Sequence, residues 1–144
     1  MSKQLKLSFL RAARTLGVFK LFRRLTQSQL RILCYHGGAI GDESEYNGKL
    51  FFSKKTFEQR MRWLREKGFN VVSLDDAVES AGGKRPAPTL ATVITFDDGW
   101  YSTRSELLPV LDKLEMPSTL YLCTSHVLEG TPVATVTTRY IIWK

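Results

Sequence analysis

The chain has 144 residues, of which 43% are hydrophobic, so it is long and apolar enough for one globular domain with its own core. Its formal net charge is +7, but the first 41 residues hold eight Lys or Arg and no Asp or Glu, and the rest of the chain is nearly neutral. The excess charge therefore belongs to the N-terminal segment, and without an aromatic or groove-reading pattern it excludes a predicted nucleic-acid partner.

Residues 1–30 are predicted to form a basic amphipathic helical arm. Apolar residues recur there at helical spacing among the basic ones, namely Leu5, Phe9, Ala12, Ala13, Leu16, Phe19 and Leu25. Basic residues interrupt what would be the apolar part of a secretory signal, and the segment is too short and too charged to span a bilayer. Two interpretations stay open: the arm lies on an anionic membrane surface, or it packs its apolar face on the domain. We expect a location in the cytoplasm or on the inner membrane surface.

The domain itself is predicted to begin with a strand over residues 31–35, which ends in His36 and two glycines. Residues 39–52 are polar and contain glycine, which favours a loop. Ser53 is a predicted N-cap for a helix that runs to Lys67 and ends at Gly68, with an apolar face of Phe57, Met61 and Leu64. Met61 and Trp63 are predicted to be packing residues.

Strands continue to alternate with helices after Gly68. A second strand over 69–72 leads into Ser73, which is predicted to cap a short helix whose start explains the acidic pair Asp75-Asp76. A third strand over 91–96 is apolar at nearly every position, helical segments follow over 100–107 and 109–114, and a fourth strand covers 118–123. This alternation predicts right-handed βαβ units and a parallel sheet, whereas the pattern weakens from Leu128 onward.

Two adjacent carboxylates, Asp97 and Asp98, follow the third strand and precede Gly99. At the carboxyl end of a buried strand such a pair predicts a metal site or acid–base chemistry, because the two charges repel unless a cation or a shared proton compensates them. The same tripeptide is also ordinary turn chemistry. If the strands are parallel, His36 and His126 lie on the same rim. His36 is also explained as a histidine hydrogen-bonded in place beside a glycine turn.

Two cysteines, Cys34 and Cys123, sit in apolar strand-like runs. They are predicted to be buried free thiols in a reducing compartment, since no CxxC spacing is present. Their similar depth in the predicted strands leaves a disulfide between them open.

The motif Thr95-Phe96-Asp97-Asp98-Gly99-Trp100 resembles the first signature of the polysaccharide deacetylase family, also called NodB-like or carbohydrate esterase family 4. Further segments fall in the order of that family over about residues 31–128. These are Ile32-Leu33-Cys34-Tyr35-His36, Phe57-Glu58-Gln59-Arg60-Met61, Val71-Val72-Ser73-Leu74, Leu108-Pro109-Val110-Leu111 and Pro117-Ser118-Thr119-Leu120-Tyr121-Leu122.

The resemblance implies a fold, an activity and a site. The fold would be α/β, a partial, unclosed (β/α) barrel, with residues 31–144 as the N-terminal part of the family's domain. The activity would be removal of N-acetyl groups from an N-acetylated polysaccharide or oligosaccharide. Asp97 would be the general base, Asp98 would bind a divalent metal, usually zinc, and Trp100 would contact substrate.

The sequence departs from the family at the second motif, His-Ser/Thr-x-x-His/Ser, which supplies the other metal ligands in the family. His36 and His126 are 90 positions apart and cannot replace a pair on one helical turn. We expect that the chain is an amino-terminal fragment. An improvised site of His36, Asp98 and His126 is the alternative. A catalytically inactive module that binds carbohydrate or a membrane also stays open, and an aspartyl phosphoacceptor domain ranks behind both.

Overall fold

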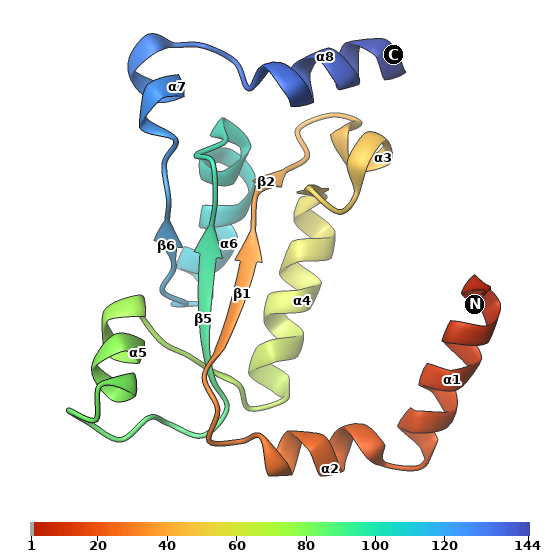
Figure 1. The fold of residues 1–144 in the computed structure, drawn as a ribbon, viewed down its shortest axis with the longest axis vertical. Helices are drawn as coiled ribbons and strands as arrows, with labels where there is room; N and C mark the ends of the chain where they lie inside the picture. The colour runs from red at the N-terminus through yellow and green to blue at the C-terminus, as the bar shows by residue number, and fades with distance from the viewer. Residues whose placement is uncertain (1) are drawn as a thin grey trace.

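The computed structural model describes residues 2–144, so Met1 of the predicted arm lies outside the described residues. Its centre is a parallel sheet around β5 (Ala91–Phe96), shown in Figure 1. One edge of β5 pairs along its length with β1 (Arg31–Tyr35). The other edge is shared by β4 (Asn70–Val71) and β6 (Thr119–Leu120), which pair with the beginning and the end of β5. Every pair is parallel, as predicted from the alternation of strands and helices.

A second, two-stranded parallel sheet joins β2 (Gly37–Gly38) to β3 (Phe51–Phe52). Between these strands the predicted loop contains one short helix, α3 (Glu43–Asn47). Neither sheet closes on itself within the described residues. The architecture is therefore the predicted partial, unclosed (β/α) barrel.

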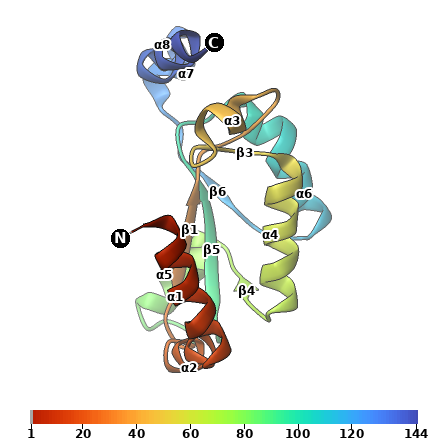
Figure 2. The same cartoon turned by 90° about the vertical axis from the view of Figure 1, so that its right-hand side faces the viewer.

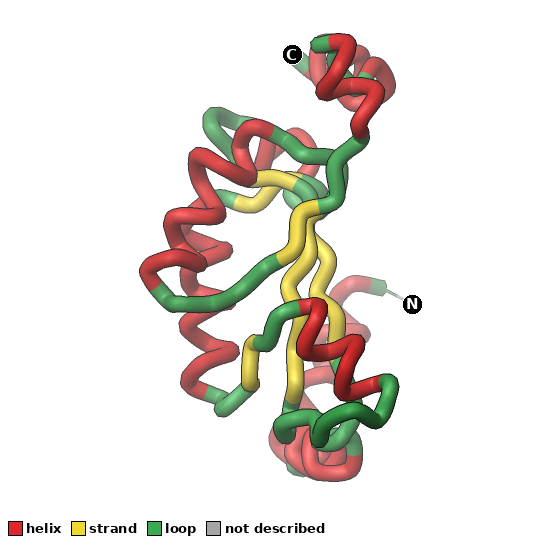
Figure 3. Tube along the Cα trace, turned by 90° about the vertical axis from the view of Figure 1, so that its left-hand side faces the viewer, coloured by secondary structure: helices red, strands yellow, loops and turns green. Residues whose placement is uncertain are grey.

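Helices α4 (Lys54–Glu66) and α6 (Leu108–Lys113) cover one face of the central sheet (Figures 2 and 3), and the hydrophobic core lies between them and the sheet. Side chains alternate across a strand, so one set of strand residues reaches this core. It packs against the buried face of the two helices. The set comprises Tyr35, Ile94 and Phe96 from the strands with Phe57, Met61, Leu64, Val110 and Leu111 from the helices.

The opposite face of β1 is open. Ile32 is 57% exposed, and Cys34, which shares its face, is also exposed. The prediction of a buried Cys34 is therefore wrong, because β1 is covered on one face only. Cys123 is half-buried and precedes a helix instead of ending a strand. Both cysteines are free thiols, as predicted.

The helix predicted after Ser53 is α4. The Ser53 hydroxyl accepts a hydrogen bond from the Thr56 N–H, and Gly68 follows the helix at φ 71°. Glycine is the usual residue at such a positive φ, which explains why the helix ends there. Met61 is fully buried, whereas Trp63 is half-exposed and packs on Phe69 with ring centroids 5.7 Å apart.

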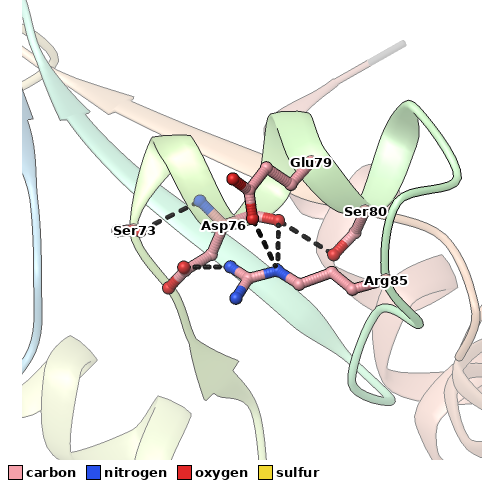
Figure 4. Close-up of polar contacts among 5 residues, drawn as sticks. All are labelled: Ser73, Asp76, Glu79, Ser80 and Arg85. Carbon is pink, nitrogen blue, oxygen red and sulfur yellow. Dashed lines mark hydrogen bonds and ion pairs between the residues drawn. The ribbon is translucent and has the colours of Figure 1, made fainter.

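The acidic pair Asp75-Asp76 begins α5 (Leu74–Ala81), as its capping role predicts. The Ser73 hydroxyl accepts from the Asp76 N–H at 3.1 Å, and the Arg85 side chain pairs with the carboxylates of Asp76 and Glu79 (Figure 4). The hydrogen bond from Arg85 is the main cause that lowers the pKa of the Asp76 carboxyl, and the bond with Ser73 adds to it. This pair is a local helix-start structure with no role in a metal site.

Replacing Arg85 with Gln (R85Q) is expected to raise the pKa of the Asp76 carboxyl toward its ordinary value. A carboxyl whose pKa is lowered by folding stabilises the fold above the unfolded value near 3.9, and this contribution disappears as the pH falls through the folded pKa. R85Q should therefore reduce stability slightly at neutral pH and leave it unchanged in strong acid. An NMR titration of the side-chain carboxyl measures the shift, with R104Q as the control, and an unmoved Asp76 would refute the pairing.

Three elements differ from the prediction. The N-terminal arm is two helices, α1 (Lys3–Thr15) and α2 (Val18–Leu25), because Gly17 at φ 73° turns the chain between them. The fourth strand is reduced to β6, and the residues that follow it form α7 (Thr124–Glu129). The segment of weak pattern forms α8 (Ala134–Trp143).

Helix α8 is held against α3 by aromatic and charged contacts. The rings of Tyr140 and Trp143 lie 5.5 and 5.7 Å from that of Tyr46, and Asp42 accepts hydrogen bonds from Tyr140 and Lys144. These contacts explain the apolar residues at the end of the chain, which the sequence pattern alone left without a partner.

Candidate active site at the end of strand β5

The first acidic residue extends the ladder between β5 and β1. The Asp97 N–H donates to the Tyr35 carbonyl at 2.9 Å, so its backbone is fixed by the sheet. Asp97 follows Thr95 by two positions, and its side chain therefore belongs to the open face of the sheet. The sequence prediction that Asp97 lies at the carboxyl rim is confirmed in position.

The second acidic residue has an unusual backbone. Asp98 has φ 71°, and the Gly99 N–H donates to the Asp97 carbonyl at 2.9 Å, which closes a γ-turn around Asp98. Residues other than glycine rarely adopt this conformation, and such residues gather at functional sites. Gly99 itself has φ 79°, and a Cβ there would collide with the Leu122 side chain. Because of this turn, the carboxylates of Asp97 and Asp98 leave the backbone in different directions.

Trp100 holds the Asp98 carboxylate in place. Its indole N–H donates to Asp98 Oδ2 at 3.1 Å, and its ring meets that of Phe51 edge to face at 5.2 Å. The same indole lines a pocket of about 230 Å³ that Phe51 and Tyr140 also line. Trp100 therefore connects the acidic pair to an aromatic pocket, a position that suits its predicted role in contacting substrate.

Cys34 is a neighbour of Asp97 that the sequence analysis missed. Its thiol donates to Asp97 Oδ2 at 3.0 Å, and this hydrogen bond, with a smaller contribution from burial, raises the pKa of the thiol. The strand register explains the contact. Cys34 pairs with Thr95, and Asp97 follows Thr95 by two positions, so the side chains of Cys34 and Asp97 share one face of the sheet. The thiol fills one acceptor position of the carboxylate and orients it.

The two histidines have separate places. His36 follows β1 directly, and its carbonyl accepts from the Thr103 hydroxyl at 2.7 Å, which ties the end of β1 to the π-helix η1 (Thr103–Leu107). His126 lies in α7, and its Nδ1 is 3.0 Å from the Thr131 hydroxyl. His36 is on the predicted rim, whereas His126 lies in α7 and is held there by a local contact with Thr131.

A metal centre is not assembled by the described residues. Catalytic zinc normally has three protein ligands, and among residues 2–144 no group of three His, Cys, Asp or Glu side chains could hold an ion. The improvised site of His36, Asp98 and His126 is therefore not formed. Asp98 can supply one ligand at most, and this donor set does not fit a catalytic metal by itself.

The acidic pair is nevertheless free of cationic partners in the described part of the chain. The ion pairs there join other residues, such as Arg62 with Glu58 and Lys54 with Glu106, and neither Asp97 nor Asp98 takes part in one. Both side chains are half-buried at the open rim. The arrangement leaves Asp97 able to accept a proton and Asp98 able to bind a cation.

Comparisons with known proteins identify similar sequences and folds. Residues 83–138 match the family model described as polysaccharide deacetylase. The chain is 35% identical over 78 residues to the poly-β-1,6-N-acetyl-D-glucosamine N-deacetylase of Escherichia coli (strain K12), an alignment that covers 53% of this chain and 12% of that protein.

Two solved structures share the fold. A de-N-acetylase from Aggregatibacter actinomycetemcomitans superposes with a TM-score of 0.61 at 27% identity and covers 73% of this chain and 40% of its own. IcaB from Ammonifex degensii gives 0.58 at 28% identity, over 65% of this chain and 37% of its own. The chain thus spans well under half of each of these proteins. The chain is similar to part of each of these deacetylases, and residues 83–138 match the polysaccharide deacetylase family model.

Proposed function

We propose that this chain is part of a carbohydrate N-deacetylase, which hydrolyses the C–N bond of an N-acetyl group on a polysaccharide or oligosaccharide. The supporting observation is the unpaired acidic dyad at the end of β5, with Asp97 fixed by the sheet and Asp98 in a γ-turn. The E. coli relative is named for its action on poly-β-1,6-N-acetyl-D-glucosamine, so an N-acetylated glucosamine polymer is the proposed substrate class.

In this proposal Asp97 is the general base. Its carboxylate accepts a proton from the attacking water as the water oxygen bonds to the acetamide carbon. The C–N bond then breaks as the nitrogen takes up that proton, which releases acetate and a sugar amine. Cys34 positions the carboxylate through Oδ2, which leaves the other oxygen to take the proton. Trp100 fixes Asp98 and presents its ring to the neighbouring pocket.

A divalent metal, zinc by the family's usual preference, is the proposed cofactor, with Asp98 as one ligand. The described residues do not assemble the remaining ligands. The proposal is that the ligand set is complete only together with further residues of the domain. This chain alone is then expected to release little or no acetate.

A direct test transfers residues 31–128 of this chain into the matching part of the A. actinomycetemcomitans de-N-acetylase. The chimera is supplied with zinc and an N-acetylated β-1,6-glucosamine oligomer, and acetate is measured. Acetate release by a chimera whose circular dichroism is native supports the proposal. A folded, metal-loaded chimera without activity would show that these residues no longer support catalysis.

That negative result would favour the second candidate, a saccharide-binding module that has kept the fold. The observation that favours it is that residues 2–144 contain no cluster of three metal-ligating side chains. The two candidates share the aromatic pocket beside Trp100 and differ in whether Asp97 changes acetate release.

The proposal also includes a location at an anionic membrane surface, reached through residues 1–30.

A further inference from the structure

Helices α1 and α2 carry large apolar side chains that remain exposed. Phe9 is 69% exposed, Leu16 is 79% exposed and Phe22 is 60% exposed. Of the two interpretations left open for the arm, packing of its apolar face on the domain does not hold for these side chains. An exposed apolar surface of this kind marks an interaction site.

The turn at Gly17 brings the apolar stripes of the two helices together. Phe9 and Leu16 of this surface come before the turn and Phe19 and Phe22 come after it, yet all four line one groove of about 330 Å³. The groove is lined by apolar residues only. The two short helices thus form one continuous apolar surface, which we call the arm groove.

The positive charge of the N-terminal segment indicates which partner the arm groove binds. The first 41 residues contain eight Lys or Arg and no acidic residue, and Lys20 and Arg24 are exposed on α2. A second copy of this chain would bring the same positive charge against the first, which opposes pairing of two arms. An apolar groove on a basic segment fits an anionic lipid surface, where headgroups attract the cations and acyl chains receive the aromatic rings.

We infer that α1 and α2 bind the surface of an anionic bilayer through the arm groove, with the acidic pair directed away from the lipid. No helix among residues 2–144 is long and apolar enough to cross a membrane, so the arm lies in the interface. It adjoins the end of the sheet where β1 and β5 begin, whereas Asp97 and Asp98 follow the other end of β5 (Figure 1). This inference deepens the proposed membrane location, and its orientation concerns the proposed site.

Specific contacts attach the arm to the sheet and set this orientation. The Leu90 N–H donates to the Gln27 carbonyl at 2.6 Å, and the Arg31 guanidinium donates to the Thr26 carbonyl at 2.8 Å. The Arg23 guanidinium also lies 5.7 Å from the centre of the Phe69 ring. Because these contacts surround the beginning of β1 and β5, binding through the arm groove holds the opposite rim in the aqueous phase.

Vesicle flotation with the full chain tests the binding surface. Phosphatidylglycerol–phosphatidylcholine vesicles are expected to carry the chain upward, and the double variant F9S/F22S should weaken partitioning at least tenfold, since each ring contributes burial of a large apolar side chain. The matched control V78S/L128S removes two other exposed apolar side chains and should float like the parent. Equal flotation of F9S/F22S and the parent would overturn the inference.

The electrostatic part has its own controls. K20Q/R24Q is expected to reduce partitioning about 25-fold, at about fivefold for each of the two basic residues near an anionic surface. K49Q/K55Q makes the same charge change at the opposite end of the sheet, beside β3 and the start of α4, and should have little effect. Vesicles of phosphatidylcholine alone, or high salt, should also reduce binding. Sedimentation that shows a concentration-dependent dimer in place of flotation would assign the arm groove to a second copy.

Hydrogen exchange on vesicle-bound chain tests the orientation. Protection is expected over residues 4–25, with no change over 97–103, and protection of the acidic turn by vesicles would refute the orientation. Partitioning needs no catalysis, so D97N should float like the parent. Failure of flotation with an active chimera, or flotation with an inactive one, therefore separates this inference from the deacetylase proposal.

Discussion

Replacing Asp97 with Asn (D97N) in the active chimera is expected to lower acetate release by about 100- to 10,000-fold, the range of a positioned general base. Asn keeps the size of the side chain and can still contact the Cys34 thiol, but its amide cannot take the proton of the attacking water. The sheet fixes the Asp97 backbone through the Tyr35 carbonyl, so the substitution should leave the fold intact. Steady-state acetate release and circular dichroism measure both expectations.

Two controls make the D97N result specific. D75N removes a carboxylate from the acidic pair at the start of α5, which the structure places in helix capping, and it should leave activity unchanged. Bound metal, measured after gel filtration, should be unaffected by D97N and reduced by D98N. Acetate release by D97N at the parent's rate would remove Asp97 from the role of base.

The substitution F57A should have the largest effect on stability, because Phe57 is 0% exposed and joins α4 to the sheet. Its ring meets those of Tyr35 and Phe96 at 5.1 and 6.0 Å. Truncation of a buried Phe to Ala costs about 3–5 kcal/mol, through lost burial and the cavity that remains. Since whole domains are stable by about 5–15 kcal/mol, F57A is expected to remove a large share of the free energy of unfolding.

Urea denaturation followed by circular dichroism measures this loss for the full chain. The matched control is W63A on the same helix, where the larger ring is 50% exposed and truncation should cost clearly less than F57A. Equal midpoints for F57A and the parent would contradict the assignment of this core. A larger loss in W63A than in F57A would place the core on the other face of α4.

Local patterns in the sequence predicted the elements whose causes are local. The cap at Ser53, the apolar spacing of Phe57 and Met61 and the turn at Gly68 together indicate α4, and the structure confirms it. The apolar run of β5 likewise predicted a strand that is buried on both faces. The position of the acidic pair followed from that strand, since Asp97 comes directly after it.

The features that the sequence did not predict depend on packing between residues that are far apart in the chain. The exposure of Cys34 and its contact with Asp97 depend on which face of β1 is covered, and no pattern within β1 states this. Helix α8 gains its partners from α3, through Tyr46 and Asp42, about a hundred positions earlier in the chain. The arm divides into two helices because Gly17 adopts a positive φ, and the apolar periodicity of the arm does not reveal this backbone conformation.

The backbone at Asp98 restricts which amino acids position 98 can accept. Asn, Asp and Gly tolerate a left-handed conformation best, whereas β-branched residues there are outliers. An alanine at this position would thus change the carboxylate and the turn at once, and its phenotype would mix a chemical loss with a conformational one. Asn removes the carboxylate but tolerates the same backbone, so it separates the chemical loss from the conformational one. D98N is therefore the informative substitution for any genetic screen of this residue.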